Sequence, residues 1–379
     1  MTRLLMTADA VGGVWQYATE LADALRPHGV ETVLAVMGPA EQAGPRIKPV
    51  LSDAVGGIEG SGMTEKLGGL EIIHTRLPLD WLAAGPDGVL AAGDALAALA
   101  REVGADLVHL NSPALAARAR FPVPVVAVAH GCVSTWWHAA RGAAPDAGYA
   151  WHGELMAAGL RAADVIVAPS AAFAATLQQI YDLPAAPLVV HNGRAPLPLP
   201  DDVAQTDAVF TAGRLWDEVK STPLLDRVAG LIDVPVRAAG AVAGPNGETV
   251  APRHLRLLGC LDEAALAREL TARPIYVSAA TFEPFGLSVL EAAAAGCPLV
   301  LSNIDTFREL WTGAALFVPE QDEHAYAAAI ARIRADDALR IHLGETARLR
   351  SGRYLPDAMA GAMAAIYAGL AAEPHRVAA

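Results

Sequence analysis

Cysteine is scarce in this chain of 379 residues, and its three copies lie far apart. Cys132, Cys260 and Cys297 fit neither a disulfide framework nor the paired spacing of a zinc site. This scarcity indicates a reducing compartment. The opening residues, MTRLLMTADAVGG, contain an apolar core that is too short for a secretory signal, and no small-residue cleavage pattern follows it. We therefore expect a cytoplasmic location.

Positive charge is also limited, with 28 Lys and Arg against 41 Asp and Glu, for a formal net charge of −13. Such an acidic chain is poorly suited to broad binding of nucleic acid or anionic membranes, although a local basic pocket remains compatible with it. No uninterrupted apolar run reaches transmembrane length. The most apolar segment, residues 358–372, is better explained as a packed helix. We expect no nucleic-acid partner and no stable membrane span.

Three common signatures of cofactor binding are missing from the sequence. No cluster of Asp residues resembles a metal-binding motif. No G-x-G-x-x-G dinucleotide fingerprint follows a predicted strand. The glycine-rich residues 240–247, GAVAGPNG, lack the Gly-Lys-Ser/Thr ending of a Walker A loop. The sequence thus predicts neither a bound metal nor another cofactor.

What the chain does contain is a regular alternation of short apolar runs and helical stretches. Its length favours two domains, and 53% apolar residues suffice for two cores. The alternation predicts an α/β fold with a parallel sheet in each half. Residues 191–202, HNGRAPLPLPDD, interrupt it with spaced prolines and two acids, a pattern typical of an exposed connector. We predict a Rossmann-like N-terminal domain (1–194), a linker (195–206), a Rossmann-like C-terminal domain (207–352) and a C-terminal helical segment (353–379). The ligand cleft is expected between the domains.

The most informative stretch is residues 281–298, TFEPFGLSVLEAAAAGCP. Predicted strands at 275–278 and 299–302 flank it, so it supplies the loop and the helix of a βαβ unit. Glu283 precedes Pro284, which disfavours helix for the residue before it. We therefore expect Glu283 in the loop at the carboxyl end of the strand, where open α/β sheets bind ligands.

The same stretch predicts an anion site beside two carboxylates. Gly286 permits a tight turn, and a helix of strong formers follows it. The free amides of residues 285–288 at the start of that helix favour an anion. Glu291, on the same helix, lies within reach of whatever is attached to that anion. Taken alone, this arrangement also fits a hydrolase that uses two carboxylic acids.

Three further loops are expected to face the cleft. Gly12 and Gly13 follow the first strand and let the backbone approach a ligand closely. His130 ends an apolar strand that is typical of a sheet buried on both faces. Arg214 and Lys220 follow the first strand of the second half, and two cations there suit a diphosphate. Each of these residues alone is more often structural. The prediction of a ligand site therefore rests on their shared position at the cleft.

In this order the motifs resemble those of the retaining glycosyltransferases of family 4, which have the GT-B fold. The resemblance covers nearly the whole chain. It is carried by Gly12-Gly13, His130-Gly131, His191-Asn192-Gly193, Gly213-Arg214-Leu215, Lys220, Leu258-Gly259-Cys260-Leu261, Glu283-Pro284-Phe285-Gly286-Leu287 and Glu291-Ala292. The chain departs from the family pattern at two positions. His191 stands where the family has Pro, and Ser221 follows Lys220 where Gly is usual, which leaves the geometry of that loop open.

The resemblance implies four catalytic residues, Glu283, His130, Arg214 and Lys220. The two cations would neutralise the leaving diphosphate of a nucleotide sugar. Glu283 would contact the transferred sugar beside its anomeric carbon, and His130 would contact the donor sugar or help to place the acceptor. Because fixed cations and a helix N-terminus carry the negative charge, no metal is expected.

The resemblance also implies the rest of the donor site and the path of the C-terminus. Glu291 would hold the ribose hydroxyls, and the C-terminal helix would return to the N-terminal domain. The full predicted donor set is Gly12, Gly13, Arg214, Lys220, Cys260, Leu261, Glu283, Phe285, Gly286, Leu287, Ser288 and Glu291.

The acceptor is less defined. Trp15, Trp136, Trp137 and His138 are candidates for its side of the cleft, because indole rings stack on sugar faces and the last three follow His130 in what we expect to be a loop. A sugar, a lipid-linked molecule and a small polar molecule all remain open. We therefore expect hexosyl transfer from a nucleotide sugar, UDP-sugar favoured and ADP- or GDP-sugar possible. The alternatives are a non-catalytic nucleotide-sugar binder and an epimerase of the same fold.

Overall fold

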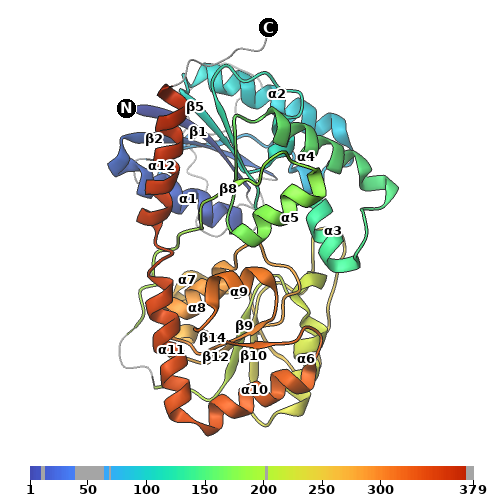
Figure 1. Cartoon of the computed structure of the whole chain (residues 1–379), viewed down its shortest axis with the longest axis vertical. Helices are drawn as coiled ribbons and strands as arrows, with labels where there is room; N and C mark the ends of the chain where they lie inside the picture. Colours follow the sequence, from blue (N-terminus) through green and yellow to red (C-terminus); the bar gives the residue numbers. More distant parts are fainter. Residues whose placement is uncertain (10–12, 39–63, 68–69, 201–203, 373–379) are drawn as a thin grey trace.

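Two α/β domains are stacked one above the other in the computed structural model, which describes residues 1–9, 13–38, 64–67, 70–200 and 204–372 (Figure 1). Parallel strands dominate the sheet of each domain, so the predicted GT-B class is confirmed. The N-terminal domain contains β1 (Thr2–Asp9), α1 (Gly13–Leu25), η1 (Arg26–His28), β2 (Val30–Met37), β3 (Thr64–Leu67), β4 (Leu70–His74), η3 (Asp80–Leu82), α2 (Pro86–Glu102), β5 (Leu107–Leu110), η4 (Pro113–Ala116), β6 (Val125–Val128), α3 (Val133–Arg141), η5 (Ala147–Tyr149), α4 (Ala150–Ala162), β7 (Val165–Ala168), α5 (Ala171–Tyr181) and β8 (Leu188–Val189).

The strands of the N-terminal sheet follow the order β3-β4-β2-β1-β5-β6-β7-β8. All of these pairs are parallel except β3 with β4. Side chains of β1 alternate between the two faces, as a strand requires. Leu5 packs with α2, α4 and α5 on one face, whereas Leu4 and Met6 pack with α1 on the other. Both faces are therefore covered, which explains the uninterrupted apolar runs of the central strands.

The C-terminal domain holds a second sheet in the order β11-β10-β9-β12-β13-β14, and all of its pairs are parallel. Helices α8 and α9 cover one face, and α6 and α10 cover the other. The elements are β9 (Val209–Ala212), η6 (Glu218–Lys220), α6 (Thr222–Leu231), β10 (Val236–Ala239), β11 (Arg256–Gly259), α7 (Glu263–Thr271), β12 (Ile275–Ser278), α8 (Leu287–Ala294), β13 (Leu299–Ser302), α9 (Asp305–Trp311), β14 (Ala315–Val318), α10 (Glu323–Ala335), α11 (Asp337–Ser351) and α12 (Pro356–Ala372).

The structure corrects the prediction of a loop after His130. Residues 133–141 form helix α3, so Trp136, Trp137 and His138 are helical. The backbone N–H of Cys132 donates to Thr135 Oγ1 at 2.9 Å, which stabilises the helix start, and Gly142 ends the helix in the left-handed region with φ 61°. Trp136, Trp137 and His138 have only moderate helix propensity, so the sequence did not predict this short helix.

The last helix returns to the N-terminal domain, as expected from the GT-B resemblance. In Figure 1, α12 lies beside α1 at the far end of the molecule from α10. Its buried residues, Met359, Ala360, Met363 and Tyr367, join the core formed by β1 and α1. Residues 337–372, which include α12, are long and apolar enough in composition to span a membrane. Within the fold, the apolar side of α12 is occupied by α1.

The two chain crossings between the domains touch each other. A Cβ placed on Gly193, just before the predicted linker, would lie 2.6 Å from the carbonyl oxygen of Leu355, so only glycine fits there. The backbone N–H of Arg194 donates to the carbonyl of Tyr354 at 3.0 Å. Gly193 and Arg194 belong to the outgoing crossing, and Tyr354 and Leu355 to the returning one.

Candidate active site

Lys220 and Glu283, predicted to be catalytic from separate motifs, form an ion pair at the carboxyl end of the C-terminal sheet. Lys220 Nζ lies 2.6 Å from Glu283 Oε2, and each side chain is 19% exposed. A backbone hydrogen bond of 2.9 Å from Thr281 N–H to the Val219 carbonyl ties the two loops together. Lys220 also lines a small hollow with Gly213 and residues of β9 and β12. The pair is thus held by backbone and remains partly open to solvent.

The N-terminus of α8 begins immediately after Glu283. Gly286 is the residue before the helix, with φ 95°, and it supplies no side chain to cap the first amides. A Cβ at Gly286 would lie 3.2 Å from the Phe307 ring, so glycine is favoured by both its φ and its surroundings. Phe285 is buried, whereas Leu287 and Ser288 are partly exposed. The start of α8 therefore has no side-chain cap at the residues where the anion site is predicted.

Arg214 lies in the loop after β9 and is held by Asp217. Its NH2 group donates to Asp217 Oδ2 at 2.8 Å, while the arginine side chain stays 49% exposed. Asp217 is almost fully buried and also accepts from the indole N–H of Trp136 at 2.8 Å. The sequence analysis did not identify Asp217. Its signal was its position at the start of η6, where an acidic residue commonly caps the helix, and it does accept from Val219 N–H.

Ser221, which replaces the family's usual glycine, adopts the left-handed conformation with φ 53°. Its hydroxyl accepts from Gln321 Nε2 at 3.3 Å. A non-glycine residue costs about 1 kcal/mol or more in this region. The loop that carries Lys220 therefore keeps a glycine-like backbone although the residue is serine.

Glu291 is buried on α8 and is bound by Arg194, the last residue of the predicted N-terminal domain. Arg194 Nε donates to Glu291 Oε1 at 2.9 Å, and both side chains are less than a tenth exposed. Arg194 also pairs with Glu20 of α1 and lies 3.8 Å from Glu263 of α7. Burial raises the pKa of Glu291, and the guanidinium opposes that rise. One arginine thus joins the predicted ribose-binding residue to the other domain.

His130 stands at the end of β6, half-buried. Its Nε2 lies 2.8 Å from Asn111 Oδ1, and the ring of Tyr17 packs edge-on against it with centroids 4.4 Å apart. Burial, followed by the nearby imidazole of His109, lowers the pKa of His130 to about 3. His130 is therefore a neutral side chain at physiological pH.

The N-terminal glycine loops lie against the loop and helix that contain Glu283. A Cβ built on Gly131 would lie 3.6 Å from the Pro284 ring, which places the residue after His130 beside the residue after Glu283. A Cβ on Gly13 would lie 3.5 Å from Leu287 at the start of α8. Gly12 lies outside the described residues. The structure therefore brings the Gly13, His130 and Glu283 regions together across the cleft.

Cys260 and Leu261, which belong to the predicted donor set, follow the edge strand β11. Cys260 is exposed and Leu261 is partly buried. The carbonyl of the preceding Gly259 accepts from Gly240 N–H at 2.8 Å, which fixes the start of this loop beside β10.

The acceptor-side candidates do not form one cluster. Trp15 lies on α1 and packs against the N-terminal core, while Trp136 contacts the C-terminal domain through Asp217. Trp137 packs between Trp136 and Tyr149. His138 is exposed on α3. These positions connect Trp136 with the Arg214 loop rather than with Trp15.

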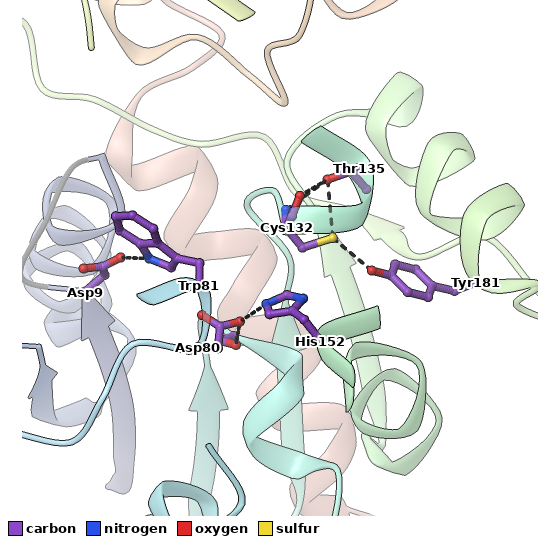
Figure 2. Close-up of polar contacts among 8 residues, drawn as sticks. Asp9, Asp80, Trp81, Cys132, Thr135, His152 and Tyr181 are labelled. Carbon is purple, nitrogen blue, oxygen red and sulfur yellow. Dashed lines mark hydrogen bonds and ion pairs between the residues drawn. The ribbon is translucent and has the colours of Figure 1, made fainter. Parts of the chain in front are cut away.

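A different set of polar side chains gathers at the carboxyl end of the N-terminal sheet (Figure 2). Asp9, at the end of β1, accepts from the indole N–H of Trp81 at 3.1 Å. Asp80 accepts from the Ser112 hydroxyl at 2.7 Å and contacts His152 Nε2 at 3.1 Å. Burial would raise the pKa of Asp80, but these two hydrogen bonds and the imidazole lower it overall. The sequence signal that was missed is that Asp9 and Ser112 each stand where a strand ends.

Cys132 lies near this group but lacks the features of a nucleophile. Figure 2 shows its sulfur between Thr135 and Tyr181, and the Tyr181 hydroxyl lies 3.0 Å from Sγ. Burial raises the pKa of the Cys132 thiol, so it stays protonated at neutral pH.

Sequence profiles of known families match both domains. The profile for Glycosyltransferase Family 4 matches residues 11–194, and that for Glycosyl transferases group 1 matches residues 248–350. The matched ranges contain His130, Glu283 and Glu291, and one range lies in each of the two domains that border the cleft. The chain belongs to glycosyltransferase family 4.

Relatives within these families align over part of the chain. A phosphatidyl-myo-inositol mannosyltransferase from Mycolicibacterium smegmatis is 36% identical over 104 residues, which span 27% of this chain and 27% of that protein. A D-inositol 3-phosphate glycosyltransferase from Corynebacterium glutamicum is 28% identical over 182 residues, 43% of each chain. The alignments thus span between about a quarter and less than half of these relatives' lengths.

Solved structures of other proteins share the fold over nearly the whole chain. Sucrose-phosphate synthase from Thermosynechococcus elongatus superposes with a TM-score of 0.75 at 21% identity, over 98% of this chain and 99% of that one. Anabaena HepE in complex with UDP gives a TM-score of 0.70 at 17% identity, over 98% and 100%. Both domains are therefore arranged as in GT-B glycosyltransferases.

Proposed function

We propose that this protein is a retaining glycosyltransferase that moves a hexosyl group from a nucleoside diphosphate sugar to a hydroxyl of an acceptor without a bound metal. The observation that carries the proposal is the Lys220–Glu283 pair at the carboxyl end of β12, directly before the uncapped N-terminus of α8. A cation, a carboxylate and a helix N-terminus then converge on one partly open position. A diphosphate with a sugar attached satisfies all three groups.

The leaving group is stabilised by fixed charge. Lys220 exchanges its bond to Glu283 for one to a phosphate oxygen, and the half-exposed Arg214 reaches the same diphosphate from the neighbouring loop. The amides at the start of α8 add their partial positive charge. Charge-assisted hydrogen bonds to an anion are about twice as strong as neutral ones, and they act most strongly where charge accumulates in the transition state.

Transfer proceeds on one face of the sugar. The bond between the anomeric carbon and the diphosphate oxygen breaks, and the acceptor oxygen bonds to that carbon from the same side. The acceptor's proton passes to the departing phosphate oxygen. A two-acid scheme is disfavoured because Glu291 is occupied by Arg194 in a buried pair, which leaves Glu283 alone beside the sugar. Glu283, released from Lys220, then accepts hydrogen bonds from the hydroxyls of the transferred sugar.

The donor and acceptor classes rest on similar proteins. HepE was solved with UDP, with UDP and glucose, and with UDP-glucose, which supports a UDP-sugar as the favoured donor, while ADP- and GDP-sugars remain candidates. The names of the relatives mention phosphatidyl-myo-inositol and D-inositol 3-phosphate. A cyclic polyol or its derivative is thus the first acceptor class to test, followed by sugars.

The deciding experiment incubates the protein with UDP-, ADP- and GDP-sugars in the presence of a chelator, with and without inositol and sugar acceptors. We expect slow donor hydrolysis and faster transfer with one base, and NMR of the product should show the anomeric configuration of the donor. Binding without hydrolysis or transfer supports the non-catalytic binder instead. A changed sugar still attached to its nucleotide supports the epimerase. An inverted product contradicts the retaining mechanism, and loss of transfer on adding chelator contradicts metal independence.

A further inference from the structure

A chain of hydrogen bonds connects the C-terminal helix to His130. The Tyr367 hydroxyl on α12 lies 2.7 Å from His109 Nδ1, and His109 Nε2 lies 3.1 Å from Asn111 Oδ1. The same Asn111 oxygen lies 2.8 Å from His130 Nε2. Tyr367 and His109 are fully or almost fully buried, and Asn111 and His130 are partly buried. The relay therefore runs from the interior to the cleft.

The direction of each bond follows from Asn111. Its side-chain Nδ2 donates to the backbone carbonyl of Thr7 at 2.6 Å, and its backbone N–H donates to Thr7 Oγ1 at 2.8 Å. The amide is thereby fixed with its oxygen toward the two imidazoles. An amide oxygen accepts and cannot donate, so His109 and His130 must both present an Nε2–H to it.

The tautomers then follow. A neutral imidazole with hydrogen on Nε2 has its lone pair on Nδ1. His109 Nδ1 accepts from the Tyr367 hydroxyl, which fixes that ring. Among the residues that the structure describes, none is hydrogen-bonded to His130 Nδ1. Burial lowers the pKa of His109 to about 4, as it also lowers that of His130, so both rings stay neutral.

We propose that Asn111, His109 and Tyr367 are positioning residues that hold His130 in the Nε2–H tautomer, so that Nδ1 accepts a hydrogen bond from a hydroxyl of the bound sugar. The hydroxyl as ligand rests on the proposed function, whereas the tautomer does not. His130 is the residue next to Gly131, which lies beside Pro284 and therefore beside the loop of Glu283. The final helix thus contributes to the reacting site through a residue that never touches substrate.

A double-mutant cycle tests whether Asn111 acts through His130. Asn111→Leu keeps a similar volume and removes the acceptor oxygen. We expect it to lower kcat by about tenfold, the effect of one hydrogen bond, with the donor KM changed less than about twofold. In a His130→Ala background the same substitution should change kcat by less than about twofold. An equal loss in both backgrounds would overturn the proposal.

Tyr367→Phe provides a gentler variant that removes a single hydroxyl far from the cleft. We expect kcat to fall by about threefold, and this loss should also vanish in the His130→Ala background. Tyr326→Phe is the matched control, because Tyr326 is a buried tyrosine on α10 whose hydroxyl donates to the Ser278 carbonyl at 3.4 Å and lies outside the chain of bonds to His130. An equal loss of kcat in Tyr326→Phe would overturn the assignment of Tyr367 to the relay.

The tautomer itself can be observed without any activity. Long-range ¹H–¹⁵N correlation on ¹⁵N-histidine-labelled full-length protein should show His109 and His130 as neutral Nε2–H tautomers, with signals assigned from His109→Gln and His130→Gln. His130 as Nδ1–H, as a mixture or as imidazolium at neutral pH would overturn the proposal. If wild-type protein transforms no donor, the proposed function fails, and this measurement still decides whether the relay exists.

Discussion

The two domains present their polar groups to the cleft in different ways. In the C-terminal domain the groups are paired ions, Lys220 with Glu283 of the neighbouring loop and Arg214 with Asp217 of its own loop. In the N-terminal domain the central group is the neutral His130, held by an amide rather than by a charge. Paired ions can exchange partners when a charged ligand arrives, whereas a neutral relay keeps its geometry. The C-terminal domain is therefore suited to hold and release a diphosphate, and the N-terminal domain to orient hydroxyl groups.

Arg194 joins the two domains through Glu20 and Glu291, and its loss should have the largest effect. Arg194→Met leaves the buried Glu291 and the partly buried Glu20 without their cation. Removing one partner of a buried ion pair costs about 3–5 kcal/mol, so the free energy of unfolding should fall by about that amount in chemical denaturation. Adding Glu291→Gln should restore part of the loss. If Arg194→Met is as stable as wild type, the ion pairs of Arg194 with the two carboxylates do not stabilise the fold.

Lys220→Ala tests whether ion exchange drives catalysis in the C-terminal domain. Losing one charge-assisted bond to the leaving group should lower kcat/KM by roughly one to two decades. Lys220→Arg keeps the charge and is the matched control, which should lose less activity. The measurement is steady-state transfer with the donor found in the panel. An unchanged kcat/KM in Lys220→Ala removes Lys220 from the mechanism.

The two glutamates should separate into different kinetic defects. Glu283→Ala should mainly lower kcat, because Glu283 lies beside the reacting sugar. Glu291→Ala should mainly raise the donor KM, because the predicted role of Glu291 is to bind the ribose. Each effect should be about tenfold or more, the value of a hydrogen bond to a charged group. Steady-state kinetics and donor titration measure both, and the same defect in both variants would contradict this division.

Trp136→Phe distinguishes the predicted acceptor role from the contact that the structure contains. The variant keeps an aromatic ring and loses the N–H that donates to Asp217. If Trp136 supports the Arg214 loop, the donor KM should rise by about three- to fivefold, corresponding to one neutral hydrogen bond, with the acceptor KM unchanged. A selective rise in the acceptor KM would instead support the predicted role of Trp136 in binding the acceptor. Trp137→Phe serves as control, because Trp137 packs on Trp136 and Tyr149 and has no hydrogen bond to the other domain among the residues that the structure describes.

The smallest expected effect concerns pH at the contact between the domains. Glu309 of α9 accepts from the Ala171 and Ala172 amides at 2.9 and 2.8 Å and contacts His191 Nε2 at 3.2 Å. Burial would raise the pKa of Glu309, but the hydrogen bonds from His191 and the two amides lower it overall.

Because the folded pKa lies below the unfolded one, the stabilisation from Glu309 is present above the unfolded value, near 4.5, and is lost as pH falls through the folded value. The melting temperature of Glu309→Gln should therefore lie below that of wild type at pH 7, and the gap should close on acidification. A gap that stays constant between pH 7 and pH 3 would contradict this assignment.

The part of the predicted donor site around Glu283 could be predicted because its residues lie close together in the sequence. The loop with Glu283, the glycine turn and α8 lie within one stretch, and local propensity was enough to place all three. Strands β12 and β13 have the predicted bounds for the same reason. The departure from the family pattern at Ser221 could also be identified from the sequence, although the sequence did not predict the backbone conformation of this residue.

Residues that act through distant contacts could not be found this way. Arg194 and Glu291 are 97 positions apart, and His109 and Tyr367 are 258 apart. Neither pair shares a motif, because only the folded arrangement of the crossings and of α12 brings them together. The helix that contains Trp136 was predicted as a loop for a related reason, since a nine-residue helix bordered by Gly131 and Gly142 is weakly encoded and the partner of Trp136 lies in the other domain. Local patterns indicate elements, and topology decides their contacts.

The contact between Gly193 and Leu355 has a mechanical consequence. Two separate tethers would let the domains slide, but here the two tethers touch without room for even a methyl group, as a single pivot would require. We infer that the domains open by rotation about this pivot, as in hinge motions. In Figure 1 the returning chain passes between α11 and α12 on the left, whereas α3 lies on the right. Spin labels across the α3–η6 contact should therefore separate more on opening than labels across the pivot, and equal changes would contradict rotation.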